Sequence, residues 1–180
     1  MSTLCPPKPV RLMMSLIYPD RALLDSLLEE LKREFEKLEL IGQEFSFDHT
    51  SYYKTEMGAE LIRRFVTSPD LIARDRLPSI KLLTNELEKR FSRVDGRRRV
   101  NIDPGYLTLE NLILATGKNY SHRVYLSEGI YADLTLIFQE GSYQPLPWTY
   151  PDYRSEEIVS LMNAVREKYL LQLREMGGRE

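Results

Sequence analysis

The chain has 180 residues, of which 42% are hydrophobic and 29% are charged, and its formal net charge is −2. This composition is ordinary for a globular protein, and the length suffices for one domain with a substantial core. Dedicated nucleic-acid-binding proteins usually carry a basic excess, so the charge argues against that class. The single cysteine, Cys5, excludes an internal disulfide and a cysteine-rich zinc site.

The sequence shows no sign of a membrane span or an export signal. No apolar run approaches the roughly 18 residues that a spanning helix needs. The opening MSTLCPPKP lacks the basic-then-apolar order of a secretory signal, and Arg11 and Ser15 interrupt the apolar segment that follows. We therefore expect a cytoplasmic protein that forms a single α+β domain over residues 1–180.

Apolar spacing predicts six elements in the first part of the chain, in the order strand, helix, strand, strand, helix, strand. Their expected ranges are 10–18, 20–38, 40–50, 60–67, 79–91 and 98–103. The first strand is apolar on both faces, which is typical of a central strand. Asp20 and Ser79 are suitable N-caps for the helices. Ser68-Pro69-Asp70 starts a turn or a short helical segment that runs through Arg76.

This order of elements is that of the ferredoxin-like fold, a split β-α-β arrangement with two helices on one face of an antiparallel sheet. The alternative is another α+β sandwich with a different strand order. Asp103-Pro104-Gly105 is predicted as a tight turn, and Thr108 as the cap of a helix that Gly117 ends. A hairpin, a proline-rich strap over residues 142–153 and a last helix capped by Ser155 extend this core.

The hairpin pairs residues 122–126 with residues 130–138. A two-residue turn at Glu128-Gly129 would set Arg123 opposite Leu134. A three-residue loop with Gly129 in the left-handed conformation instead sets Arg123 opposite Asp133, and Tyr125 opposite Tyr131. We expect the three-residue loop, because opposite charges and paired aromatic rings stabilise neighbouring strands.

Several segments resemble an uncharacterised prokaryotic family of domain-of-unknown-function proteins. They are FSFDHTSYYKTEMG, KLLTNELEKRFS, PGYLTLENLILATGKNYSHRVYL, GIYADLTLIF and PLPWTYPDYR, which together extend over nearly the whole chain. Some members are labelled GTP-binding proteins, so the resemblance implies nucleotide binding as one option. The residues argue against a standard GTPase, because Gly117-Lys118 is followed by Asn119 and lacks the upstream glycine of a phosphate loop.

A first polar group combines a histidine with carboxylates and tyrosines: Asp48, His49, Tyr52, Tyr53 and Glu56. Imidazole and carboxylate together suit a divalent metal. However, neighbouring residues on a strand point to opposite faces, and no H-x-H or H-x-x-x-H spacing is present. We therefore expect no metal site, and the plain alternative is a strand end with an aromatic loop over the sheet.

A second group gathers polar residues from the centre of the chain: Asn101, Asp103, Tyr106, Lys118, His122 and Arg123. Its last three members form a local basic group that could receive a phosphate or carboxylate, the arginine with a bidentate fork. Asp103, His122 and Arg123 could each have a purely structural role instead. Asp103 could bond backbone amides of a turn, His122 could be a core histidine, and Arg123 could simply pair with Asp133.

A third group lies in the strap and consists of Trp148, Tyr150, Asp152 and Tyr153. Aromatic residues between prolines can line a ligand pocket, but we expect them to clamp the strap onto the core. The basic run Arg97–Arg99, preceded by Arg90 and Arg93, is expected to be a solvated helix end rather than a nucleic-acid contact.

The resulting hypothesis is a protein that binds an anionic small molecule, phosphorylated or nucleotide-like. Lys118, His122 and Arg123 would contact the anion, and Asn101 and Asp103 would orient the ligand or hold a metal. An aromatic ring, from Tyr106 or Trp148, would stack on the ligand. If a reaction occurs, its acid–base residue would be His122 or His49, because the unperturbed pKa of histidine lies near 6.5. The alternative is a non-enzymatic protein–protein interaction or assembly module. Cofactor and oligomeric state stay open.

Overall fold

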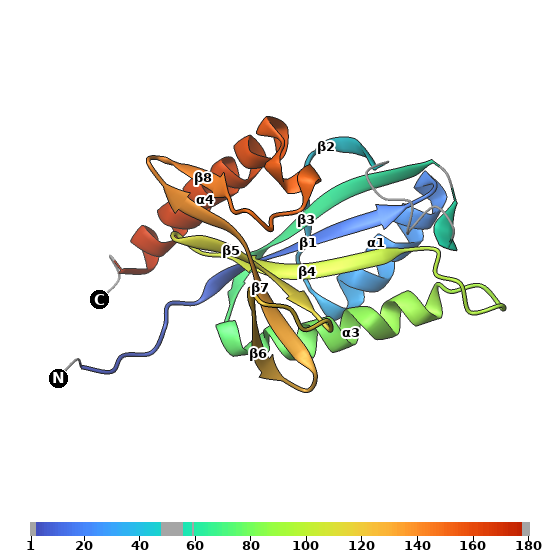
Figure 1. The fold of residues 1–180 in the computed structure, drawn as a ribbon, viewed down its shortest axis with the longest axis horizontal. Helices are drawn as coiled ribbons and strands as arrows, with labels where there is room; N and C mark the ends of the chain where they lie inside the picture. Colours follow the sequence, from blue (N-terminus) through green and yellow to red (C-terminus); the bar gives the residue numbers. More distant parts are fainter. Residues whose placement is uncertain (1–2, 48–55, 59, 178–180) are drawn as a thin grey trace.

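The computed structural model describes residues 3–47, 56–58 and 60–177. In these ranges eight strands form one antiparallel sheet in the order β2-β3-β1-β4-β5-β7-β6, with β8 also paired to β7 (Figure 1). The strands are β1 Val10–Tyr18, β2 Glu39–Phe47, β3 Leu61–Ile72, β4 Asn101–Leu107, β5 Asn111–Thr116, β6 Arg123–Ser127, β7 Ile130–Gln139 and β8 Ser142–Pro145. The helices are α1 Arg21–Glu34, α3 Leu77–Arg90 and α4 Glu156–Gly177, with short 3₁₀ turns η1 Arg74–Arg76 and η2 Pro151–Arg154.

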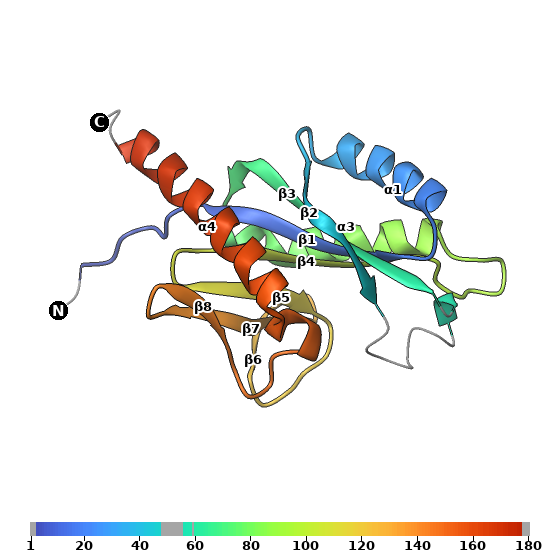
Figure 2. The same cartoon turned by 90° about the horizontal axis from the view of Figure 1, so that it is seen from above.

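The expected α+β class is confirmed. The first four strands have the order β2-β3-β1-β4, with α1 and α3 packed on one face, which is consistent with a ferredoxin-like core. Helix α4 packs on the opposite face, as the two views of the ribbon show (Figures 1 and 2). The sheet therefore has helical cover on both sides.

Strand β1 lies at the centre of the sheet, and all nine of its residues are buried. Leu12, Met14 and Leu16 pack against α1 and α3, whereas Met13 belongs to the apolar cluster beneath α4. Full burial of an aliphatic side chain contributes about 1.5–3 kcal/mol. The strand predicted from apolar residues on both faces is confirmed.

Local signals place two helix starts close to their predicted positions. The Asp20 carboxylate accepts a hydrogen bond from the Leu23 backbone N–H at 2.9 Å, so it caps α1 as expected, and the helix ends at Glu34 instead of Leu38. Helix α3 starts at Leu77, two residues before Ser79. The predicted cap is therefore inside the first turn.

The predicted turn at Ser68-Pro69-Asp70 is wrong, because β3 continues through it to Ile72. The short helical segment that was expected to run through Arg76 is present as η1, but it starts only at Arg74. The register against β1 shifts between Met13, which pairs with Thr67, and Arg11, which pairs with Leu71. The proline thus lies in a bulge, where its missing N–H costs no ladder hydrogen bond.

The predicted turn at Pro104-Gly105 and the helix after Thr108 are also wrong. Strand β4 runs through Pro104 to Leu107, and β5 replaces the helix. The Thr108 hydroxyl accepts hydrogen bonds from the N–H groups of Glu110 at 3.0 Å and Asn111 at 2.9 Å. Hydrogen bonds of this kind also cap helices, which is why Thr108 was predicted as a helix cap. Here they close a tight turn between two strands.

The hairpin has the predicted cross-strand pairs, Arg123 with Asp133 and Tyr125 with Tyr131. Its loop differs from the prediction. Ser127 pairs with Ile130, and both residues between them have positive φ, 51° at Glu128 and 79° at Gly129. This is a two-residue turn, and the extra residue Leu126 forms a bulge that restores the register.

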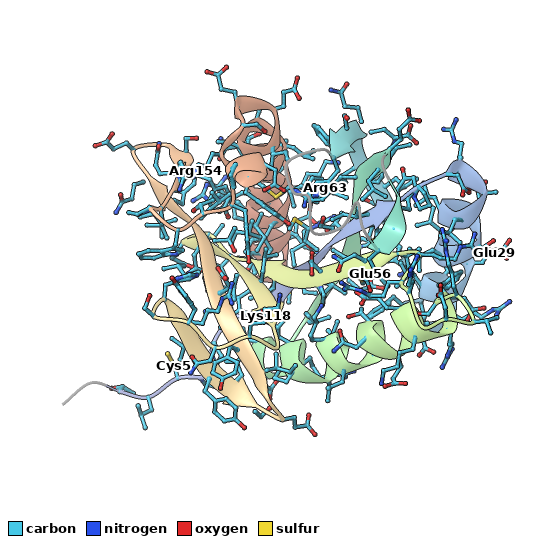
Figure 3. All side chains as sticks on the ribbon, turned by 45° about the vertical axis from the view of Figure 1, so that its right-hand side comes forward. Cys5, Glu29, Glu56, Arg63, Lys118 and Arg154 are labelled. Atoms are coloured by element: carbon cyan, nitrogen blue, oxygen red, sulfur yellow. The ribbon has the colours of Figure 1, made fainter. Side chains whose placement is uncertain are left out.

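The strap between β7 and α4 is fastened to the sheet, as the clamp interpretation predicts. The Trp148 indole N–H donates to the Leu134 carbonyl at 2.8 Å, and the Thr149 hydroxyl donates to the Thr135 carbonyl at 2.5 Å. Arg154, labelled in Figure 3, donates to the Thr149 carbonyl at 2.8 Å and so closes the strap on itself. The strap thereby carries the chain into α4.

Helix α4 buries an apolar stripe that includes Ile158, Met162 and Val165. Near its C-terminal end the Tyr169 hydroxyl donates to the Pro9 carbonyl at 2.7 Å. The Gln172 side-chain amide donates to the Pro69 carbonyl at 2.7 Å. The last helix is therefore joined to the start of β1 and to the bulge of β3.

The close approach of β4 and β5 predicts a strict requirement for Gly105. A Cβ at this position would overlap the Ile113 carbonyl oxygen, so Gly105→Ala should lower the free energy of unfolding by about 1–3 kcal/mol. Gly117→Ala is the control, because nothing lies near its Cβ position. Chemical denaturation of both variants measures the difference, and equal stability would contradict this account of the β4–β5 contact.

Candidate functional site

The face of the sheet beneath α4 carries polar side chains from five strands. Directly paired residues of an antiparallel sheet point to the same side. The register pairs Ser15 with Asp103, Ile17 with Arg63 and Asn101, Leu114 with Asp133, and Asp133 with Arg123. We call Ser15, Arg63, Asn101, Asp103, Arg123 and Asp133 the polar face.

Tyr106 does not join the polar face. It pairs with Leu12 and Ile113 on the other side of the sheet, where it packs near Leu77 of α3. Burial raises the pKa of its hydroxyl. The sequence placed Tyr106 with Asn101 and Asp103 because a turn was expected after residue 103, whereas the continued strand alternates it to the opposite face.

Asp133 is the centre of the polar face at the β6–β7 end. Its carboxylate accepts a hydrogen bond from Arg123 Nε at 2.8 Å and lies 3.3 Å from His122 Nε2. The Thr135 hydroxyl lies 3.4 Å from the other carboxylate oxygen. The side chain of Asp133 is 6% exposed, so this charge depends on these partners.

Arg123 is held on three sides. Besides the Asp133 bond, Nη1 donates to the Lys118 carbonyl at 3.1 Å and Nη2 donates to the Tyr150 hydroxyl at 2.9 Å. Burial alone would lower the pKa of Arg123, but Asp133 and Tyr150 raise it above its ordinary value. The guanidinium is therefore a fixed cation with little freedom to move.

Aromatic rings surround His122 next to this arginine. Its imidazole stacks on Trp148 with ring centroids 5.0 Å apart and an interplanar angle of 11°. Tyr120 approaches the same imidazole edge-on at 5.3 Å. The buried Nδ1 atom of His122 has no hydrogen-bond partner among the described residues. The structure thus brings together His122, Arg123, Trp148 and the backbone of Lys118 from the predicted set.

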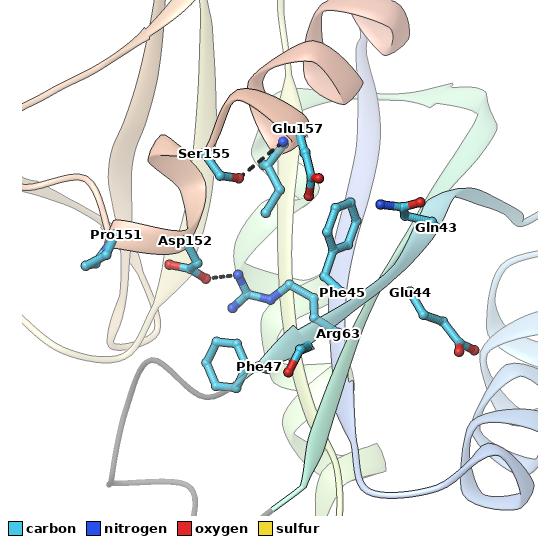
Figure 4. Close-up of a pocket in the computed structure, with 11 residues that line it drawn as sticks. Gln43, Glu44, Phe45, Phe47, Arg63, Pro151, Asp152, Ser155 and Glu157 are labelled. Atoms are coloured by element: carbon cyan, nitrogen blue, oxygen red, sulfur yellow. Dashed lines mark hydrogen bonds and ion pairs between the residues drawn. The ribbon is translucent and has the colours of Figure 1, made fainter.

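Sequence reasoning missed Arg63, which lies on β3 at the other end of the polar face. Its side chain is 5% exposed and forms an ion pair with Asp152 of η2 (Figure 4). The guanidinium carbon lies 4.4 Å from the Phe47 ring centroid and 5.2 Å from that of Tyr153, distances typical of cation–π contacts. The signal that could have found it is a charged residue at an inward position of a buried strand.

Tyr153 connects the two ends of the polar face. Its hydroxyl faces that of Ser15, and neither completes a hydrogen bond of good geometry within the described residues. Burial raises the pKa of Tyr153 to about 12, and both Asp103 and Asp133 act on this hydroxyl, as does Arg63. Both carboxylates are therefore near enough to influence this hydroxyl, although β5 separates their strands.

Asn101 and Asp103 form part of a hydrogen-bonded chain at the β4 edge. The Asn101 amide donates to Asp103 Oδ2 at 2.7 Å and accepts from Arg98 Nη1 at 3.0 Å. Arg98 in turn donates to both carboxylate oxygens of Glu56, at 2.9 and 2.7 Å. Lys81 of α3 lies 3.6 Å from Asp103. These bonds fix the side chains without any ligand.

A cleft of about 460 Å³ opens between β2 and the start of α4. Its lining includes Phe45, Phe47 and Arg63, and also three carboxylates, those of Glu44, Asp152 and Glu157 (Figure 4). Among the described residues that line the cleft, these carboxylates outnumber the cationic side chains, so an anion would meet net repulsion from them.

The structure does not describe most of the first polar group. His49, with Asp48, Tyr52 and Tyr53, lies outside the described residues. Across residues 3–47, 56–58 and 60–177, no three His, Cys, Asp or Glu side chains gather in a way that could hold a metal ion. Nor does any helix in the same ranges have the length and apolar character needed to cross a membrane.

Comparison with known protein families identifies the chain. A family model described as a domain of unknown function, DUF4416, matches residues 8–169. The chain belongs to the DUF4416 family. No curated protein and no solved structure matches the sequence. The resemblance seen in the five sequence segments is thereby confirmed, whereas the family description carries no support for GTP binding.

The DUF4416 match covers the whole of the sheet. It begins before β1 and ends at Tyr169, whose hydroxyl reaches back to Pro9. The polar face, the strap and the part of α4 up to Tyr169 therefore all lie within the family domain. The site described above is a property of this domain and not of an appended segment.

The Glu56–Arg98 pair predicts a pH-dependent contribution to stability. The hydrogen bonds from Arg98 lower the pKa of Glu56 below its ordinary value of 4.5, despite partial burial. The contribution is therefore present above that ordinary pKa and is lost as the pH falls through the lowered value. We expect Glu56→Gln to cost about 1.5 kcal/mol at pH 7 and progressively less toward pH 3.

Denaturant titrations at several pH values measure this difference. Glu86→Gln is the matched control, because Glu86 forms an exposed pair with Lys89 on α3 and should contribute little at any pH. A constant gap between wild type and Glu56→Gln from pH 7 to pH 3 would show that the charge of Glu56 is not responsible.

The buried Arg63–Asp152 pair predicts a large effect when one partner is removed. Asp152→Ala leaves the guanidinium of Arg63 buried without this carboxylate, and we expect a loss of about 3 kcal/mol in the free energy of unfolding. Glu157→Ala changes an exposed carboxylate of the same cleft and should change stability by less than about 0.5 kcal/mol. Similar losses for the two variants would argue against the buried pair.

Proposed function

We propose that this DUF4416 protein binds a small anionic molecule, phosphorylated or nucleotide-like, at the β6–β7 end of the polar face. The observation that supports the proposal is the fixed guanidinium of Arg123. Three of the five N–H groups of this arginine donate to Asp133, Lys118 and Tyr150. The two that remain have no partner among the described residues, and two N–H groups on one guanidinium can receive a phosphate or carboxylate.

The surroundings of Arg123 suit a ligand with a flat ring. Trp148 is 39% exposed and is held by its bond to the Leu134 carbonyl and by its stack on His122. A fixed aromatic ring with an open surface can receive a base or a sugar. Because Asp133 offsets much of the Arg123 charge, recognition would depend on directed hydrogen bonds as well as on charge.

The proposed site also includes His122, Asn101 and Asp103. His122 is the acid–base candidate at this end, because its Nε2 atom faces Asp133 and the other nitrogen has no partner among described residues. Asn101 and Asp103 lie on β4, which β5 separates from β7, and would orient a larger ligand. The cytoplasmic location is proposed on sequence grounds alone.

A thermal-shift screen tests anion binding. Phosphate, GTP, ATP and sugar phosphates are added to wild type, Arg123→Ala and Arg166→Ala. A ligand at a hundred times its dissociation constant should add about 2.7 kcal/mol to wild-type stability, and Arg123→Ala should lose this gain. Arg166 is the matched control, because it also bonds a carbonyl, that of Leu109, at 2.8 Å, and covers the Phe138 ring.

The outcomes separate binding from stability. Arg166→Ala should melt at a lower temperature yet keep the ligand-induced increase. Equal increases for wild type and Arg123→Ala would contradict the assigned role of Arg123. No increase with any of the anions would contradict the proposed function.

The second candidate function is a non-enzymatic protein–protein interaction or assembly module. A specific observation favours it, namely a group of exposed apolar and aromatic side chains around β6. Its members, with exposed fractions of 39% to 68%, are Tyr120, Val124, Tyr125, Leu126, Trp148 and Tyr150. Exposed apolar side chains at the edge of a sheet often mark a contact with another protein.

A further inference from the structure

Strand β6 forms one edge of the sheet in the described part of the chain. Edge strands present unpaired backbone N–H and C=O groups, and natural proteins usually protect such edges with outward charges, prolines or bulges. The only charged residue of β6 is Arg123, which turns inward to Asp133. Val124 and Tyr125, on opposite faces of the strand, are 68% and 57% exposed. The edge therefore combines unpaired backbone with apolar surface.

Strand β2, at the opposite edge of the same sheet, has features that protect an edge against pairing with another strand. Strand β2 carries the exposed carboxylates Glu39 and Glu44, and its register shifts at Gly42, where φ is 67°. A second strand approaching β2 would meet two negative charges and a bulge. On β6 only Leu126, at the turn end, forms a bulge, and no charge points outward. The edge at β2 is thus protected by charges and a bulge, whereas the edge at β6 lacks outward charges.

The exposed area around β6 approaches that of a stable contact. Three tyrosines and one tryptophan are each 39% to 65% exposed in this region, and an aromatic side chain buries roughly 150–250 Å² when covered. These four side chains could therefore bury about 400 Å² on each molecule. Val124, Leu126 and the strand backbone add to this, which approaches the roughly 600–800 Å² per partner of standard stable interfaces.

We infer that β6 pairs in antiparallel fashion with β6 of a second copy of this chain. A copy is the fitting occupant because the strand has no outward charge that a partner would have to neutralise, and its apolar residues would meet the same residues across a two-fold axis. Such pairing joins the two sheets into one and covers Val124 and Tyr125 on both molecules. The inference rests on the second candidate function and names its partner.

The first experiment measures molecular mass by sedimentation. Wild type should be a dimer, and Val124→Lys should weaken the dimer at least about tenfold, because a buried apolar side chain becomes a charge on the edge. Leu40→Lys is the matched control, since Leu40 is a 43% exposed apolar residue on the protected edge β2. This variant should stay dimeric. A monomeric wild type up to millimolar concentration, or a dimeric Val124→Lys, would overturn the inference.

The second experiment tests the strand contact itself in a Cys5→Ser background, which removes the only native thiol. In a two-fold antiparallel pair one residue faces its own copy, with Cβ atoms about 4.5–5.5 Å apart. Val124→Cys or Tyr125→Cys should therefore form a disulfide-linked dimer under mild oxidation, while Leu40→Cys should not. Equal cross-linking at all three positions would overturn the inference. Anion binding is judged separately, because Val124→Lys should keep the phosphate-induced thermal shift if that proposal holds.

Discussion

The complete burial of β1 is the constraint on which the rest of the structure depends. A strand that is apolar on both faces needs cover on both faces, and α1 and α3 supply it on one side only. The other side is covered by α4, which the strap delivers across the sheet. Because β1 also includes Ser15, this cover closes over polar atoms as well as apolar ones. The polar face is thus a consequence of how the second layer is built.

Charges within that layer occur in opposed pairs that join separate parts of the chain. Arg63 connects β3 to η2 through Asp152, and Asp133 connects β7 to β6 through Arg123. Buried pairs of this kind contribute little net stability, since desolvation offsets their attraction, but an unpaired member is costly. They therefore favour one arrangement of strap and sheet over others. The guanidinium of Arg123 is fixed for the same reason, and this rigidity supports its proposed role as a ligand contact.

The sequence predicted those features that a short stretch of residues decides. The Asp20 cap, the central strand β1 and the Arg123–Asp133 pairing follow from spacing and local chemistry, and all are confirmed. Thr108 shows the limit, because its hydroxyl makes the same backbone bonds in a strand turn as at a helix start. Tyr106 was misplaced with the same segment. Arg63 could not be identified as a site residue, since its partner Asp152 lies 89 positions away and only the strap brings them together.

The bond from Tyr169 to the Pro9 carbonyl, which spans 160 positions, has a consequence for biosynthesis. Strand β1 is synthesised well before α4, so the face of the sheet that α4 covers stays open until α4 has left the ribosome. Contacts of such long sequence separation are slow to form, and exposed apolar strands are prone to aggregate meanwhile. This apolar face is therefore protected only once α4 has been made and packs on it.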